Sequence, residues 1–181
     1  MDIARDLFFA QQAIMAWFAV TNKLQMHGDK YLEDLTVRQM LAIPTIFHAP
    51  DGKATINHIA RQLGTTKQSA KQIVDALEKK KYLSVARNER DKRAVNVSIT
   101  KEGHRALRLC SKLLDEFLAD IFREFTTEDL EKLCEFLKKL YRFDGSEQEG
   151  IEEHVNYDAA KADDTLKYHQ NFLKKRRDNR A

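Results

Sequence analysis

The segment that decides the fold is residues 55–87, TINHIARQLGTTKQSAKQIVDALEKKKYLSVAR. A short amphipathic run ends at Gly64, and a second run begins after Thr65 or Thr66, either of which suits the N-cap of a helix. The apolar residues of the second run recur at helical spacing and form one narrow stripe: Ala70, Ile73, Val74 and Leu77. We therefore predict two short helices in succession, the second with a polar face turned to solvent.

The following residues, 82–99, change from helical periodicity to alternation. The segments YLSVAR and AVNVSI have the length of strands, and Val95, Val97 and Ile99 alternate with small or polar residues, which is typical of a half-buried hairpin strand. The link NERDKR between them is charged or amide-bearing throughout. Two short helices and a hairpin with a basic tip have the order of a winged helix-turn-helix, whose second helix enters the major groove of DNA.

The charge of the chain is concentrated around this segment. Residues 53–110 contain 14 Lys and Arg against 5 Asp and Glu, a net charge of +9, whereas the rest of the chain carries −6. Such a basic segment is expected of a nucleic-acid-binding module, although a solvated charged surface has the same composition. The sequence has no nucleophile–base arrangement, phosphate loop or metal-ligand spacing, so we expect no enzyme, cofactor or metal site.

Long helices are predicted on both sides of the basic segment. Residues 2–26 carry apolar side chains on more than one face, which fits a dimer core or, for part of it, the wall of a ligand pocket. Thr36 and Gln39 stand at capping-box spacing before a helix that Pro44 should kink or shorten. Thr100 caps a long helix, and Thr126 or Thr127 starts another.

Three further features bear on the class of protein. Residues 151–173 combine an apolar stripe with the absence of Gly and Pro, which predicts a helix, the alternative being a disordered acidic-then-basic tail. Cys110 and Cys134 lie on apolar stripes, where a structural role is expected and thiol-based sensing is the alternative. No membrane span or signal peptide is recognisable, which predicts a cytoplasmic protein without membrane contact.

Three segments resemble the MarR family of bacterial transcriptional regulators over roughly residues 35–140: LTVRQ, INHIARQLGTTKQSAKQIVDALEKKKYL and ERDKRAVNVSITKEG. The most specific is Asp91-Lys92-Arg93 before a strand and Thr-Lys-Glu-Gly, which is similar to the Asp-x-Arg wing of that family. The resemblance implies a homodimer, held by the first and last helices, on a near-palindromic operator. It also implies a repressor released by a small ligand or by oxidation.

The chain departs from the family pattern in three places. Lys81 stands where the family usually has a glycine in left-handed backbone, which Lys tolerates poorly, so the helix end is open to a different geometry. Pro44 in the second helix is unusual. The 40 residues after Tyr141 extend beyond the usual end of the family.

We therefore predict a mainly α protein with a small β-hairpin, a winged helix-turn-helix domain plus long dimerisation helices. Its regions are 1–34 (N-terminal dimerisation helix), 35–100 (DNA-binding domain), 101–141 (C-terminal dimerisation helices) and 142–181 (charged extension, helical). The residues expected at double-stranded DNA are Thr66, Lys67, Gln68, Ser69, Lys71, Gln72, Arg87, Arg90, Asp91, Lys92 and Arg93. Arg93 should enter or border the minor groove, with Asp91 fixing its direction.

The predicted function is sequence-specific regulation of transcription by a homodimer, as a repressor that responds to a small-molecule effector. The alternative is a protein-interaction scaffold, in which the long helices bind a partner and the basic hairpin is incidental. The steep salt dependence of phosphate contacts separates DNA binding from a hydrophobic interface.

Overall fold

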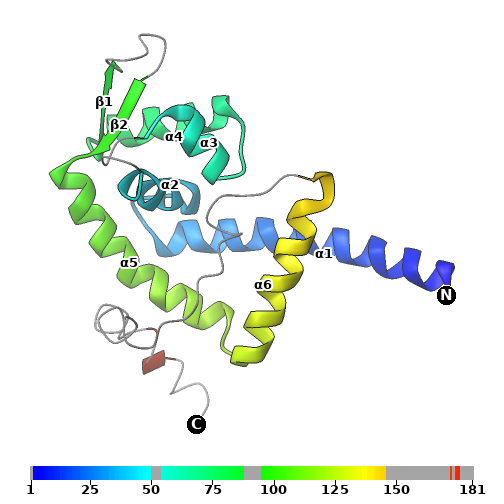
Figure 1. The fold of residues 1–181 in the computed structure, drawn as a ribbon. Helices are drawn as coiled ribbons and strands as arrows, with labels where there is room; N and C mark the ends of the chain where they lie inside the picture. Colours follow the sequence, from blue (N-terminus) through cyan, green and yellow to red (C-terminus); the bar gives the residue numbers. More distant parts are fainter. Residues whose placement is uncertain (1, 50–53, 88–94, 146–171, 173, 176–181) are drawn as a thin grey trace.

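The chain is mainly helical, with one antiparallel hairpin, as the sequence predicts (Figure 1). Its structure is a computed structural model that describes residues 2–49, 54–87, 95–145, 172 and 174–175. The elements are α1 (Ile3–Tyr31), α2 (Val37–Phe47), α3 (Ile56–Gln62), α4 (Lys67–Lys79), β1 (Leu83–Arg87), β2 (Val95–Ile99), α5 (Lys101–Ile121), α6 (Thr127–Tyr141) and the 3-10 turn η2 (Arg142–Asp144).

Threonine N-caps place the starts of most helices. The hydroxyls of Thr36, Thr66, Thr100 and Thr126 each accept a hydrogen bond from the backbone N–H three residues later. Such a bond satisfies one of the four backbone donors that have no partner at a helix N-terminus. The predicted capping box of α2 is present, and the start of α4 falls after Thr66 rather than Thr65.

The hydrophobic core lies between α2, α3, α4 and the hairpin. Its fully buried large side chains are Ile43, Ile46, Ile59, Val74, Leu77 and Val97. Val97 is the inward residue of β2, so the alternation in the sequence gives the correct face of the strand. Pro44 lies inside α2, which ends three residues later at Phe47. This core holds α4 at one end of the molecule, beside the hairpin (Figure 1).

Helix α4 ends in left-handed backbone at Lys81, whose φ is 64°. The Lys81 N–H donates to the Glu78 carbonyl at 2.8 Å, and the Tyr82 N–H donates to the Leu77 carbonyl at 2.9 Å. These two bonds are the 5→2 and 6→1 pair of a Schellman motif, a helix end that favours glycine. The chain therefore keeps the helix end that glycine would favour, although a lysine occupies the position.

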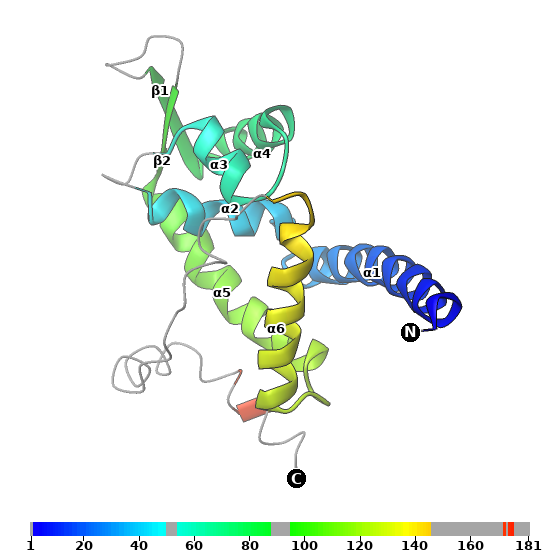
Figure 2. The same cartoon turned by 45° about the vertical axis from the view of Figure 1, so that its right-hand side comes forward.

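The outer helices are only partly covered. The C-terminal end of α1 packs on α5, where Gly28 is buried against Phe117 and the Tyr31 ring lies 5.1 Å from the Phe117 ring. The N-terminal half of α1 projects away from the rest of the described chain (Figures 1 and 2). Helix α6 contains no buried residue in the described part of the chain. Both helices therefore present apolar side chains to solvent in the single chain.

Some predictions fall on other parts of the chain. The helix predicted for 151–173 lies outside the described residues, except for Phe172. Cys110 is buried, and desolvation raises the pKa of its thiol. Cys134, expected on an apolar stripe, is exposed in the single chain, because nothing described covers its face of α6. Among the described residues, no helix is both long and apolar enough to cross a membrane.

Candidate nucleic-acid interface

Helices α3 and α4 form a helix-turn-helix around a tight turn. Gly64 adopts a φ of 58° after the last residues of α3, and the Thr65 N–H donates to the Ala60 carbonyl. Left-handed backbone is readily available to glycine, which explains its place in the turn. The stripe Ala70, Val74 and Leu77 of α4 is buried against the core, so the opposite face of α4 remains in solvent.

The predicted DNA-reading residues of α4 fall into two groups. Lys67, Gln68 and Gln72 are exposed, and their side chains make no hydrogen bond or ion pair with the described residues. The Thr66 hydroxyl instead accepts from the Ser69 N–H at 3.1 Å and donates to the Ser69 hydroxyl at 3.0 Å. The first group is therefore available to a ligand, whereas the second is engaged in closing the start of the helix.

Lys71 lies on the same face but has a partner. Its Nζ is 2.6 Å from a carboxylate oxygen of Asp75, one helical turn later, and both side chains are more than half exposed. Such an exposed pair stabilises a helix by only about 0.3–0.5 kcal/mol. The lysine can therefore leave Asp75 for a phosphate at little cost.

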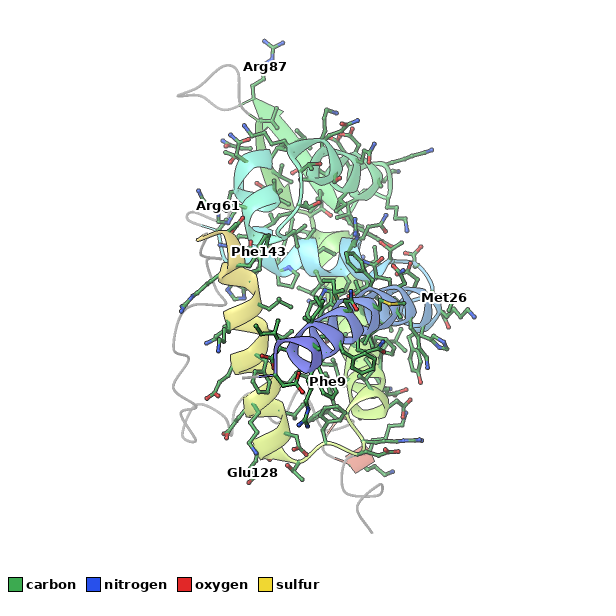
Figure 3. All side chains as sticks on the ribbon, turned by 90° about the vertical axis from the view of Figure 1, so that its right-hand side faces the viewer. Phe9, Met26, Arg61, Arg87, Glu128 and Phe143 are labelled. Atoms are coloured by element: carbon green, nitrogen blue, oxygen red, sulfur yellow. The ribbon has the colours of Figure 1, made fainter. Side chains whose placement is uncertain are left out.

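The hairpin stands beside the start of α5 and adds one predicted residue to the described surface. Arg87 is the last residue of β1, is exposed, and points away from the body of the molecule (Figure 3). The wing residues Arg90, Asp91, Lys92 and Arg93 lie outside the described residues, and so does the expectation that Arg93 reaches the minor groove.

Sequence reasoning missed two tertiary contacts that position these elements. Ala54 pairs with Val97 through two backbone hydrogen bonds of 3.0 and 2.8 Å, which anchors β2 to the segment before α3. The second contact lies at the end of α4, where Lys80 and Tyr82 bind Asp34 in the turn after α1. The hydrogen bond to Asp34 raises the pKa of Tyr82 to about 12. No periodicity or motif links residues so distant in sequence.

A cavity of about 190 Å³ lies behind the helix-turn-helix, between the C-terminal part of α1, α2 and the α3–α4 turn. Its walls are Gln25, Arg38, Leu41, Leu63, Gly64, Thr65 and Ile73. The cavity therefore combines an apolar wall with one guanidinium and one amide. Among the described residues, no group of His, Cys, Asp and Glu could hold a metal ion.

Residues 33–94 match the model of the MarR family, and this span contains the helix-turn-helix and β1. The transcriptional repressor MprA of Escherichia coli is 24% identical over 133 residues, which cover 72% of this chain and 76% of MprA.

Solved structures share the fold beyond that span. A mutant of MarR from E. coli complexed with operator DNA has a TM-score of 0.65 at 22% identity, covering 77% of this chain and 99% of that one. BpsR of Bordetella bronchiseptica, whose DNA binding is regulated by 6-hydroxynicotinic acid, has a TM-score of 0.58 at 13% identity, covering 70% and 98%. The chain thus matches the MarR family model over its helix-turn-helix and β1, and it shares its fold with MarR of E. coli beyond that span.

Proposed function

We propose that the chain is a homodimeric repressor that binds a near-palindromic operator sequence-specifically and responds to a small ligand. The observation that carries the proposal is the solvent-facing, unpaired set Lys67, Gln68 and Gln72 on α4, at the same end of the molecule as the hairpin. The related protein MprA is a repressor, and a structural neighbour was solved on operator DNA.

The predicted DNA-reading residues each have a role in this proposal. Gln68 and Gln72 are amides one helical turn apart, and an amide can bind the N6 and N7 atoms of adenine in the major groove. Lys67 and Lys71 bind phosphates, and Arg87 continues this contact along the hairpin. Thr66 and Ser69 lie at the N-terminus of α4, where backbone N–H groups and the helix dipole favour a phosphate.

The homodimer is supported by apolar side chains that the single chain leaves in solvent. Large apolar residues that are at least 37% exposed gather on α1 and around α6: Ile3, Leu7, Phe8, Phe9, Ile14, Met15, Trp17, Phe18, Val20, Met26, Phe125, Phe136, Leu140 and Phe143. Figure 3 places Phe9 on α1 and Phe143 at the end of α6. A monomer rarely exposes so extensive an apolar surface, whereas a dimer interface buries it.

The effector proposal rests on the cavity behind the helix-turn-helix. Arg38 and Gln25 can bind a carboxylate or hydroxyl group, while Leu41 and Ile73 contact an apolar ring. BpsR, which shares the fold, is regulated by a small aromatic acid. Because the cavity touches α4 through Ile73, a bound acid would contact the recognition helix from behind. A thermal-shift screen of aromatic acids, with Arg38→Ala as the control, tests this site.

The DNA-binding proposal is tested by selecting DNA fragments from a random pool and measuring affinity against salt. Lys67→Ala should weaken binding to every sequence and reduce the slope of log affinity against log salt by about 0.9. Gln68→Ala and Gln72→Ala should relax the sequence preference at about 1–3 kcal/mol per lost base contact. Lys112→Ala, an exposed lysine on α5, is the matched control and should change neither.

A pool that yields no preferred sequence, or mutants of α4 that all behave like Lys112→Ala, would refute the proposal. The second candidate, a protein-interaction scaffold, is favoured by the exposed apolar face of α6. It predicts a partner whose binding is nearly insensitive to salt, in contrast to the phosphate contacts of the first candidate.

A further inference from the structure

The C-terminal end of the recognition helix α4 is bound by the turn that follows α1. Lys80 donates from its Nζ to the backbone carbonyl of Asp34 and lies 3.7 Å from the Asp34 carboxylate. The Tyr82 hydroxyl donates to the other carboxylate oxygen. One aspartate therefore holds both residues that flank Lys81, the left-handed residue at which α4 ends.

The same helix end is also held by the start of α5. The Thr100 hydroxyl donates to the Lys81 carbonyl at 2.7 Å, and the Thr100 N–H donates to the Tyr82 carbonyl at 3.0 Å. Helix α5 approaches so closely that a Cβ at Gly103 would lie 2.2 Å from the Tyr82 carbonyl oxygen. The end of α4 is therefore fixed between the α1–α2 turn and α5.

The Asp34 contacts contribute more to geometry than to stability. The Asp34 side chain is 65% exposed and that of Lys80 is 35% exposed, and exposed pairs of this kind add little to the free energy of unfolding. The contacts are nevertheless directional, because a lysine and a tyrosine on one segment converge on a single residue of another. Asp34 lies three residues after Tyr31, where α1 ends.

We infer that Asp34 is a positioning residue that fixes the orientation of α4 relative to α1 and thereby sets the spacing of DNA half-sites that the protein accepts. The inference rests on the proposed homodimer, in which the exposed faces of α1 and α6 join two copies. In such a dimer, the separation and angle of the two recognition helices depend on how rigidly each is attached to the dimer helices. Asp34 attaches the C-terminal end of α4 to the turn after α1, in addition to the Thr100 contacts at the start of α5.

The experiment measures binding to operators that differ only in half-site spacing. The DNA sequence selected by the wild-type protein is synthesised with one base pair removed, unchanged, or with one or two base pairs added. Affinity for each is measured for the wild type, Asp34→Ala and Tyr82→Phe at fixed salt. Glu33→Gln is the matched control, because it removes a neighbouring carboxylate that makes no hydrogen bond or ion pair with the described residues. Thermal unfolding of each variant shows that it is folded.

The wild type and Glu33→Gln should lose about tenfold or more in affinity when one base pair is added or removed. Asp34→Ala should reduce that penalty to about threefold or less, with Tyr82→Phe in between, while affinity for non-specific DNA follows the Glu33→Gln control. A spacing profile of Asp34→Ala identical to that of the wild type overturns the inference and leaves the proposed function intact. A wild type without any spacing optimum overturns the dimeric operator and the inference together.

Discussion

Replacing Lys81 by glycine should stabilise the protein, although it removes a side chain. Lys81 adopts a φ of 64°, a left-handed conformation that costs an L-residue about 1–2 kcal/mol and costs glycine almost nothing. Glycine gives back about 0.4–1 kcal/mol because it makes the unfolded chain more flexible. We therefore expect Lys81→Gly to raise the free energy of unfolding by about 0.5–1 kcal/mol and the Tm by about 1–4 °C.

The measurement is urea and thermal unfolding at fixed protein concentration, because the stability of an oligomer such as the proposed dimer depends on concentration. Lys81→Ala is the control, since it removes the same positive charge but keeps the Cβ that disfavours left-handed backbone. It should give no increase in stability. An equal gain in the two variants would mean that charge repulsion near Lys79 and Lys80 is relieved, and a loss in Lys81→Gly would refute the conformational reasoning.

Three other variants test the packing, the Asp34 contact and the dimer. Gly103→Ala should lower the free energy of unfolding by about 1–3 kcal/mol, because its Cβ would overlap the Tyr82 carbonyl; a wild-type urea midpoint would contradict this close approach. The Tyr82 pKa, near 10 in the unfolded chain and about 12 in the fold, gives stability that is present below pH 10 and lost between pH 10 and 12. Tyr82→Phe should therefore lose less stability than the wild type over that window, and a parallel decline would argue against the bond to Asp34. Phe9→Asp places a charge in the exposed apolar face of α1 and should yield a monomer in sedimentation, whereas an intact dimer would exclude this face from the interface.

Much of the helix-turn-helix could be predicted because its signals are local. A threonine hydroxyl can accept from the backbone N–H three residues later without help from distant residues, which is why Thr36 and Thr100 mark helix starts correctly. The outward face of α4 followed from the spacing of its apolar stripe. The choice between adjacent caps did not, since Thr65 and Thr66 have the same chemistry and only the length of the α3–α4 turn selects Thr66.

For the candidate interface, the sequence determined which side chains of α4 face solvent. On a helix with one buried apolar stripe, the residues of the opposite face must point to solvent. It also determined that the hairpin has an inward and an outward face, since strand side chains alternate. Which of these residues already have partners was set by neighbours within the same helix. Lys71 meets Asp75 one turn later, and the hydroxyls of Thr66 and Ser69 are engaged in the helix cap.

The tertiary structure alone decided how α4 is attached to the rest of the protein. Lys80 and Asp34 are separated by 46 residues, and Ala54 meets Val97 across both helices of the helix-turn-helix. The family pattern left the helix end at Lys81 open, whereas the structure gives it left-handed backbone. Thr100, at the start of α5, binds this helix end through the Lys81 and Tyr82 carbonyls. A local pattern reports the preference of a residue for its neighbours in sequence, but these contacts form only when separate elements are packed on one core.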